Sequence, residues 1–382
     1  MPGLLPHVDP EGLLEYSVVF NDRALNQMSQ KFQGVMRDIS STLKRVYKAK
    51  AAIVVPGSGS FGMEAVARQF ATGRKCLVIR NGWFSYRWTQ IFDMGSIPSE
   101  TTVLKARRVA ERRQAPFAPP PIDEVVAAIR SGKPDLVFAP HVETASGMIL
   151  PDSYVKAVAD AVHAVGGLFV LDCVASGAIW VDMAATGVDV LISAPQKGWC
   201  SSPCCALVML SEAARQRIDA TTSTSFAADL RKWLQIMEAY EKGGHAYHAT
   251  LPTDALARLR DTMQEIEAYG FERVRAEQQA LGDQVRALLA SKGMVSVAAE
   301  GFQAPGVVVS YTDDPEIQSG KKFLGQGLQT AAGVPLQCDE PADFRTFRIG
   351  LFGLEKLHHP ERTVQSLAKA LEKILETAAA GA

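Results

Sequence analysis

The sequence predicts an α/β protein with a large, mostly parallel mixed sheet flanked by helices and a smaller C-terminal α+β domain. Between about residues 50 and 210, short apolar runs alternate with stretches of helical character. This alternation is typical of a parallel sheet whose crossover connections are helices. The chain of 382 residues is also longer than the roughly 250–300 residues that one hydrophobic core usually serves.

Buried strands are expected where about four to eight apolar residues follow one another without clean alternation, because a strand covered on both faces needs no polar side. Runs of this kind, rich in Val, Ile and Leu, lie at 52–55, 76–79, 135–139, 167–171 and 188–193. The step from 188–193 to the next apolar run, 206–210, is too short for a crossover helix, so this pair is expected to be antiparallel.

Helices are expected between these strands, at 62–70, 122–131 and 152–165. A longer helical stretch, 254–289, should break near Gly270 and lead into the second domain. That domain is expected to hold strands at 306–311 and 346–350 and a closing helix at 360–378. We predict an N-terminal arm at 1–20, a large domain at 21–260 and a small domain at 261–382.

Composition excludes several classes of function. Forty Lys and Arg residues against forty-one Asp and Glu residues give a net charge of −1, without the positive excess of a nucleic-acid binder. We find no secretory signal and no apolar run long enough to cross a membrane. Six cysteines in or beside apolar stretches are expected to be reduced thiols of a cytoplasmic protein. Cys200, Cys204 and Cys205 lack the paired spacing of a metal site, so no metal is expected.

Three predicted strands are followed by residues suited to one ligand, since ligands bind beyond the carboxyl ends of parallel strands. Ser58, Gly59 and Ser60 lie in a Gly/Ser loop entering a helix, which favours a phosphate, although a tight turn alone would also need glycine there. Asp172 ends a buried strand and could cap a helix or meet a cation. Lys197 follows another strand in small, apolar surroundings that suit Schiff-base chemistry, although most lysines are solvated surface charges.

Together these strand ends indicate pyridoxal 5′-phosphate (PLP) as the ligand. The sequence resembles the class V aminotransferases of the fold type I PLP-dependent enzymes, particularly the alanine–glyoxylate and serine–pyruvate aminotransferases. The resemblance covers about residues 20–380. It is carried by the segments Gly57-Ser58-Gly59-Ser60-Phe61-Gly62-Met63-Glu64-Ala65, His141-Val142-Glu143-Thr144-Ala145-Ser146-Gly147, Leu171-Asp172-Cys173-Val174-Ala175-Ser176, Ser193-Ala194-Pro195-Gln196-Lys197 and Phe347-Arg348-Ile349-Gly350.

The resemblance implies specific roles at the cofactor. Lys197 would form the Schiff base and later move a proton, and Asp172 would pair with the pyridinium nitrogen. Thr144 would hydrogen-bond the ring oxygen or nearby atoms, and Phe84 would stack on the ring, with Trp83 as the alternative. The phosphate would be bound by Ser58, Gly59, Ser60 and Gln196.

The resemblance also implies a substrate contact and a partner. Arg348 would bind the substrate carboxylate through its planar fork, which lysine could not reproduce. Tyr247 and Thr250 lie in a segment similar to one that reaches the cofactor phosphate of a neighbouring subunit. A homodimer with shared active sites is therefore expected.

Some residues depart from the family pattern. Ser60 stands where relatives often carry a histidine. After Lys197, the segment Trp199-Cys200-Ser201-Ser202-Pro203-Cys204 replaces the usual small, Asn- and Gly-containing loop. These changes put in doubt whether the amino donor is alanine or serine.

The function we expect is transamination by ping-pong chemistry, from an alanine- or serine-like amino acid to a small 2-oxo acid such as glyoxylate or pyruvate. Two alternatives stay open: a PLP-dependent lyase similar to cysteine desulfurases, with Cys338 as the candidate thiol, and a transaminase acting on an aminophosphonate. A PLP-binding regulator without catalysis is disfavoured, because Lys197 and Asp172 are both present.

Overall fold

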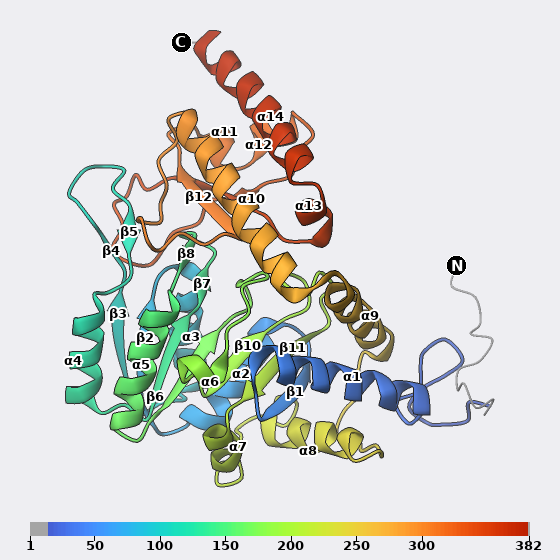
Figure 1. The fold of residues 1–382 in the computed structure, drawn as a ribbon. Coiled ribbons are helices and arrows are strands. Elements are labelled where there is room, and N and C mark those ends of the chain that lie inside the picture. Colours follow the sequence, from blue (N-terminus) through green and yellow to red (C-terminus); the bar gives the residue numbers. More distant parts are fainter. Residues whose placement is uncertain (1–13, 381–382) are drawn as a thin grey trace.

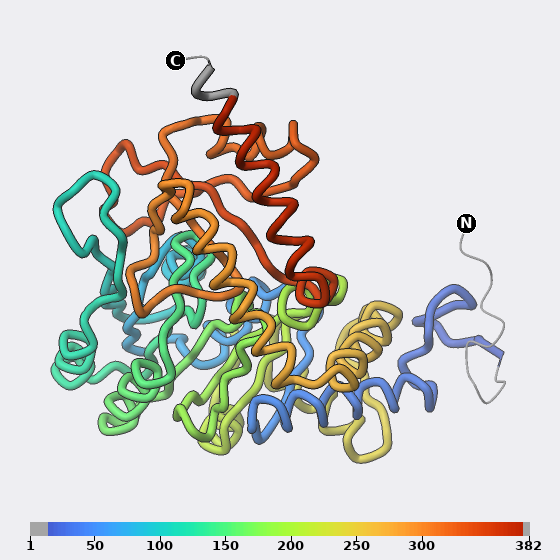
Figure 2. The backbone as a smooth tube through the Cα atoms, turned by 45° about the horizontal axis from the view of Figure 1, so that its top comes forward, coloured from blue at the N-terminus to red at the C-terminus, as the bar shows by residue number. Residues whose placement is uncertain are grey.

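The computed structural model describes residues 14–380, so most of the arm predicted at 1–20 lies outside the described residues. Residues 14–29 form no helix or strand. They lie at the end of the molecule where α1 (Gln30–Tyr47) begins, and this end projects from the body (Figures 1 and 2).

A seven-stranded sheet forms the centre of the molecule, in the order β1-β11-β10-β9-β6-β2-β3. Its strands are β1 (Ala51–Pro56), β2 (Lys75–Arg80), β3 (Glu100–Lys105), β6 (Leu136–Pro140), β9 (Leu168–Asp172), β10 (Val190–Ser193) and β11 (Cys205–Leu210). Only β11 runs against the others in this sheet. The mostly parallel sheet and the antiparallel β10–β11 pair are thus confirmed, with strand limits within two residues of those predicted.

Helices flank this sheet on several sides (Figure 1). The helices packed on strands of this sheet include α2 (Gly59–Val66), α3 (Trp83–Gly95), α5 (Asp152–Ala164) and α8 (Leu230–Glu241), and α1 also contacts β1. The helix α4 (Ile122–Gly132) packs on α5, and α1 packs on both α8 and α9 (Thr253–Tyr269). Short helices lie at α6 (Met183–Thr186) and α7 (Glu212–Ile218).

The loop after β1 is shorter than predicted. We expected a helix at 62–70, whereas α2 already begins at Gly59 and continues as a π-helical turn at Ala67–Ala71. Ser58 is extended, with φ −149° and ψ 176°, so the chain passes from strand to helix within two residues of Pro56. The loop expected to bind phosphate is therefore itself the first turn of the helix.

The C-terminal part contains a three-stranded antiparallel sheet, in the order β12-β14-β13. Its elements are α10 (Phe271–Ser291), β12 (Val307–Tyr311), α11 (Pro315–Gln318), α12 (Lys321–Leu324), β13 (Ala331–Ala332), β14 (Thr346–Gly350), α13 (Leu354–His358) and α14 (Pro360–Ala380). The predicted break at Gly270 is confirmed: its φ of +106° separates α9 from α10.

The two parts of the chain share an apolar core. Two short hairpins of the large part, β4–β5 (Arg107–Arg108 with Phe117–Ala118) and β7–β8 (Val142–Glu143 with Met148–Ile149), contact the C-terminal part. We call this cluster the second core; its members include Phe117, Val142, Met148, Val297, Val309, Tyr311 and Leu336. The predicted domain limit at 260/261 falls within α9 and stays a prediction.

Close packing of α2 on the sheet generates a stability prediction. A Cβ atom added at Gly62 would overlap Ala206 on β11, whereas one added at Gly34, within α1, would meet nothing within 4 Å. We expect Gly62→Ala to lower the free energy of unfolding by about 1–3 kcal/mol through overpacking. Gly34→Ala should raise it by up to about 1 kcal/mol, because alanine is the better helix former. Urea unfolding of both variants tests this, and equal effects would contradict the packing argument.

Candidate active site

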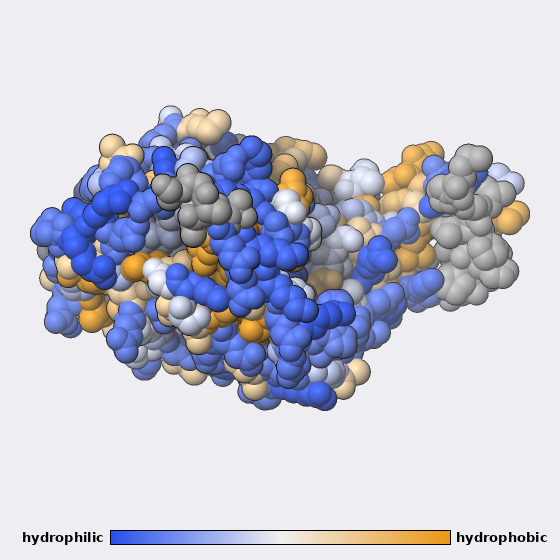
Figure 3. Space-filling model, turned by 90° about the horizontal axis from the view of Figure 1, so that it is seen from above, coloured by the Kyte–Doolittle hydropathy of each residue, from blue (hydrophilic) through white to orange (hydrophobic). Residues whose placement is uncertain are grey.

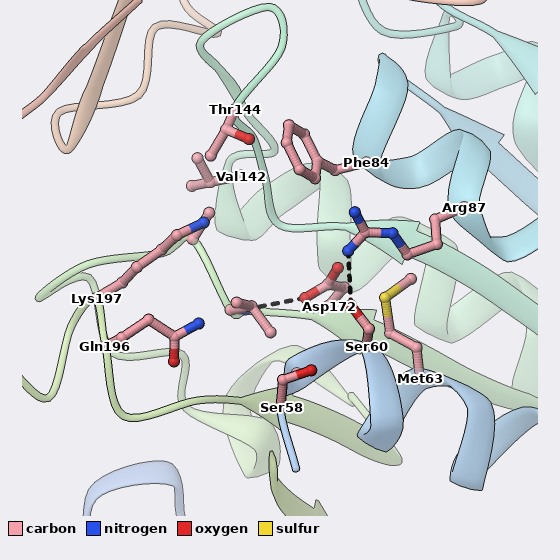
Figure 4. A pocket seen from close by; sticks show the side chains of 13 residues that line it. Ser58, Ser60, Met63, Phe84, Arg87, Val142, Thr144, Asp172, Gln196 and Lys197 are labelled. Atoms are coloured by element: carbon pink, nitrogen blue, oxygen red, sulfur yellow. Dashed lines mark hydrogen bonds between the residues drawn. The ribbon is translucent and has the colours of Figure 1, made fainter. Parts of the chain in front are cut away.

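One cavity, with about 610 Å³ of empty volume that includes open solvent, lies beyond the carboxyl ends of β1, β9 and β10. Figure 4 shows its lining side chains converging from α2, α3 and the segments that follow these strands. Of the predicted site residues, eight line it: Ser58, Gly59, Ser60, Phe84, Thr144, Asp172, Gln196 and Lys197.

The first turn of α2 forms one end of the cavity. The side chain of Ser58 makes no capping hydrogen bond to this helix, so the first-turn N–H groups are not satisfied by it. A Cβ atom at Gly59 would lie 2.7 Å from the Val174 side chain, which explains glycine at this close approach. Unsatisfied N–H groups at the positive end of a helix favour an anion.

Asp172 is the last residue of β9 and is buried. One of its carboxylate oxygens accepts a hydrogen bond of 2.9 Å from the Val174 N–H group. Burial raises the pKa of Asp172 to about 6, although this hydrogen bond and the charge of Lys197 act in the opposite direction. A carboxylate held in this way favours a cationic partner within the cavity.

The Lys197 amino group lies between two aromatic rings, 5.9 Å from the centroid of Phe84 and 5.8 Å from that of Phe352. Burial lowers the pKa of Lys197, while Asp172 and Glu143 raise it. Among the residues described, no carboxylate forms an ion pair with this amine. A desolvated lysine without a direct counter-charge is easier to deprotonate, which suits a nucleophile or a base.

Glu143 holds the start of α3 in place. This fully buried carboxylate accepts hydrogen bonds from the N–H groups of Phe84, Ser85 and Ala145 and from the Ser85 hydroxyl. A Cβ atom at Gly82 would lie 2.7 Å from the Glu143 side chain, so only glycine permits this approach. The carboxylate thereby orients Phe84 toward the cavity.

His141 holds the backbone of Asp172 in place. Its backbone N–H group donates to the Asp172 carbonyl oxygen at 2.8 Å, and its Nδ1 lies 2.7 Å from the Ser176 hydroxyl. Burial lowers the pKa of His141 to about 4, so its ring is neutral at ordinary pH. His141 therefore holds Asp172 and the segment that follows it, up to Ser176, without adding charge.

Arg87 also lines the cavity, and the sequence analysis did not identify it. Its Nη1 donates to the Ser60 hydroxyl at 2.8 Å, and its guanidinium carbon lies 5.2 Å from the centroid of the Phe84 ring. The signal that could have found it is helical spacing, because Arg87 lies one turn after Phe84 on the same face of α3. No helix was predicted there.

Arg348 lies beside the cavity rather than among its lining residues. It belongs to β14, its Nε donates to the Ala332 carbonyl oxygen at 2.8 Å, and its guanidinium carbon lies 5.6 Å from the Phe84 centroid. Burial lowers the pKa of Arg348, and Glu143 raises it. The C-terminal part of the chain thus brings a second arginine to Phe84.

Tyr247 and Thr250 are not brought to the cavity within this chain. They lie in the segment between α8 and α9, where the Tyr247 side chain is 56% exposed. The two hydroxyl oxygens lie 3.5 Å apart. Their contact with the cofactor of a neighbouring subunit stays a prediction.

Trp83 was the alternative residue for stacking on the cofactor ring, and Cys338 was the candidate thiol of a lyase. Trp83 is absent from the cavity lining and packs near Tyr86, with ring centroids 5.7 Å apart. Cys338 is buried, its Sγ lies 3.3 Å from the Arg80 carbonyl oxygen, and burial raises its pKa to about 12. This thiol is neither exposed nor ionised at ordinary pH.

Comparison with known proteins agrees with this geometry. The profile of the class V aminotransferase family matches residues 13–342. An L-aspartate–glyoxylate aminotransferase of Paracoccus denitrificans is 26% identical over 350 residues, covering 86% of this chain and 81% of the relative. The small subunit of a soluble hydrogenase of a Synechococcus strain is 24% identical over 379 residues, covering 98% and 92% of the two chains.

A crystal structure of an alanine–glyoxylate aminotransferase from a Nostoc species has the same fold, with a TM-score of 0.75 at 20% identity. The match covers 92% of this chain and 89% of that one. Fold and site together define a PLP-dependent enzyme of fold type I. The chain belongs to the class V aminotransferase family, and it is a PLP-dependent aminotransferase.

The cavity fits this cofactor. The hydroxyl oxygen of Thr144 and the carboxamide oxygen of Gln196 are buried without a hydrogen-bond partner, which a polar ligand would correct. Asp172 would hold the ring nitrogen, and the first turn of α2 would hold the phosphate. Within the described range, no group of three or more His, Cys, Asp or Glu residues could bind a metal ion, and no helix could span a membrane.

The burial of Asp172 predicts a pH-dependent stability of the cofactor-free protein. Because folding raises the pKa of Asp172 from 3.8 to about 6, the ionised carboxylate destabilises the folded state. The protonated Asp172 should contribute fully to the free energy of unfolding below about pH 3.8. This contribution, about 3 kcal/mol, should be lost as the pH rises through about 6. Urea unfolding of wild type and Asp172→Asn across this range tests this. A difference between the two that does not change with pH would contradict it.

Proposed function

We propose that the protein moves the amino group of a small amino acid, alanine- or serine-like, to a small 2-oxo acid such as glyoxylate or pyruvate, by ping-pong chemistry. The observation that carries this proposal is the convergence of the Lys197 amine, the Asp172 carboxylate and the first turn of α2 on one cavity. Arg348 lies beside that cavity, where a substrate carboxylate could reach it.

Each of these residues has a distinct task in the proposed reaction. When bound, PLP supplies an electrophilic aldehyde and a ring that withdraws electrons from the substrate. Lys197 would hold the cofactor covalently through its amine. Once the substrate amine displaces it, the freed Nζ would accept and return the proton of the substrate carbon. The lowered pKa of this amine favours its neutral, proton-accepting form. Asp172 would stabilise positive charge on the ring nitrogen, and Phe84 would pack on the ring.

Arg348 is the proposed clamp for the substrate carboxylate. Its hydrogen bond to the Ala332 carbonyl oxygen fixes the plane of the guanidinium group. In the part of the chain that the structure describes, no carboxylate forms an ion pair with Arg348. A fixed fork without an acidic partner suits bidentate binding of a carboxylate.

We favour transamination over the lyase alternative because of Cys338. A desulfurase would need a mobile, ionisable thiol, whereas Cys338 is buried with its pKa raised to about 12. An aminophosphonate donor is a matter of substrate rather than of reaction class. It is therefore included among the donors tested below.

We also propose a homodimer in the cytoplasm. Large apolar side chains are exposed near the N-terminal end and beside the Tyr247 segment, among them Leu14, Tyr16, Val18 and Phe226. In Figure 3 apolar surface gathers on the projecting end of the molecule. An exposed apolar surface favours a partner chain. All six cysteines are free, as expected in a reducing compartment.

The proposed reaction predicts a specific spectroscopic result. The PLP-loaded protein should have a visible absorption band that one amino acid bleaches and that glyoxylate or pyruvate restores, because each half-reaction changes the cofactor. The panel should contain alanine, serine, aspartate and 2-aminoethylphosphonate. Lys197→Ala, which lacks the amine, is the control and should lose turnover. A donor that is consumed without any acceptor, releasing an elimination product, would instead identify a lyase.

The proposed shared active site predicts complementation between inactive subunits. A Lys197→Ala subunit lacks the amine, and a Tyr247→Ala/Thr250→Val subunit should bind the phosphate of its partner's cofactor weakly. Random mixing of refolded subunits should restore about a quarter of wild-type activity at limiting PLP, because half of the dimers would hold one intact site. If Tyr247 and Thr250 act within their own subunit, mixing would restore nothing.

A further inference from the structure

Arg87 connects two walls of the cavity. It projects from α3, its Nη1 donates to the hydroxyl oxygen of Ser60 in the first turn of α2, and its guanidinium group packs over the Phe84 ring. Figure 4 shows this group beside Ser60, close to Asp172 and on the opposite side of the cavity from Lys197. Two contacts on two helices therefore hold its charge at the cavity wall.

The charge of Arg87 has no acidic partner in the part of the chain described, where its hydrogen-bond acceptor is a neutral hydroxyl. By contrast, Arg68, in the π-helical turn that continues α2, forms an ion pair with Glu64 at 2.8 Å. A half-buried guanidinium group without a counter-ion is costly, and an anionic ligand would offset that cost. The Asp172 carboxylate lies nearby but forms no ion pair with Arg87, so an anion bound beside Ser60 would be the direct counter-charge of this guanidinium group.

Ser60 indicates which anion this is. Because its oxygen accepts from Arg87, the hydroxyl hydrogen is left to donate to a second acceptor. Ser60 also lies at the positive end of α2, where Ser58 leaves the first-turn N–H groups uncapped. The guanidinium group, the hydroxyl and the helix end are thus adjacent donors at the place where the cofactor phosphate would lie.

We propose that Arg87, hydrogen-bonded to Ser60, binds the cofactor phosphate. Its guanidinium group would supply a positive charge there, which the neutral Ser60 hydroxyl cannot. Relatives often carry a histidine at the Ser60 position, so the Arg87–Ser60 pair would replace one aromatic donor by a charged one. Arg348 is a different case, because its hydrogen bond is to Ala332 of the C-terminal sheet rather than to α2. The inference rests on the cofactor and is independent of the amino donor.

The test compares the affinity of the cofactor-free protein for PLP and for pyridoxal, which lacks the phosphate. Arg87→Met keeps an unbranched side chain beside Phe84 but is shorter than arginine and removes the guanidinium group with its charge. It should weaken PLP binding on the order of 10- to 100-fold, as expected for hydrogen bonds to a charged group, and leave pyridoxal binding nearly unchanged. Arg87→Lys should fall between. Arg68→Met, the matched control with an arginine outside the cavity, should change neither affinity.

Two outcomes would overturn the proposal. Equal weakening for PLP and pyridoxal would mean that Arg87 acts on the ring or on Asp172, and no change for either would mean that it only supports the fold. Phosphorus NMR of bound PLP gives a second readout that does not depend on turnover. In wild type the phosphate should stay dianionic across the pH range around its second pKa of about 6, whereas in Arg87→Lys or Arg87→Met its resonance should titrate. A resonance that titrates equally in wild type would contradict the proposal even if Arg87→Met does not fold.

Discussion

One buried carboxylate fixes the geometry of the active-site wall. Glu143 has no exposed surface, and three backbone N–H groups and one hydroxyl donate to it. Leaving any such buried donor unpaired costs on the order of 1–3 kcal/mol, so the start of α3 cannot shift relative to β7 without a large penalty. Phe84 and Arg87, one helical turn apart, keep their places in the cavity for this reason. The next residue after Glu143 is Thr144, which lines the same cavity beside Phe84.

The cavity that results is rich in positive charge. Lys197, Arg87 and Arg348 all lie within 6 Å of the Phe84 ring centroid, and the described residues offer none of them an ion pair. Asp172 is the carboxylate among the lining residues of the cavity. Glu143 is not among them, and its carboxylate already accepts four hydrogen bonds. A ligand that brings both a phosphate and a carboxylate would balance these charges. PLP together with an amino acid has this composition.

The sequence was most informative where a function lies at the end of an apolar run. Asp172 and Lys197 could be predicted because a buried strand is a local pattern and its end is the next residue along the chain. β3 was not predicted, because Glu100, Thr101 and Thr102 are exposed at the edge of the sheet and interrupt the apolar pattern. Arg87 was missed because no helix was predicted there: two of the four buried residues of α3, Ser85 and Thr89, are polar, so the apolar pattern is incomplete.

Other features depend on contacts that no local pattern records. Arg348 was correctly expected on a strand, but its place beside Phe84 follows from the packing of the C-terminal part against the β4–β5 and β7–β8 hairpins. The four hydrogen bonds that Glu143 accepts include bonds from Ser85, which lies 58 residues away in the sequence. Tyr247 and Thr250 do not line the cavity of their own chain, so one folded subunit does not fix what they contact.

Lys197 and Arg348 stand on different parts of the fold. The amine follows β10 of the large sheet and the guanidinium group belongs to β14 of the small one, so no shared helix or strand sets the gap between them. The second core sets it instead, through side chains such as Phe117 and Val309 that lie between the two sheets. In the proposed reaction, apolar packing would therefore set the length of substrate that fits between the amine and the guanidinium group. Side chains that do not contact the proposed substrate would thus set the spacing between the two groups that bind it.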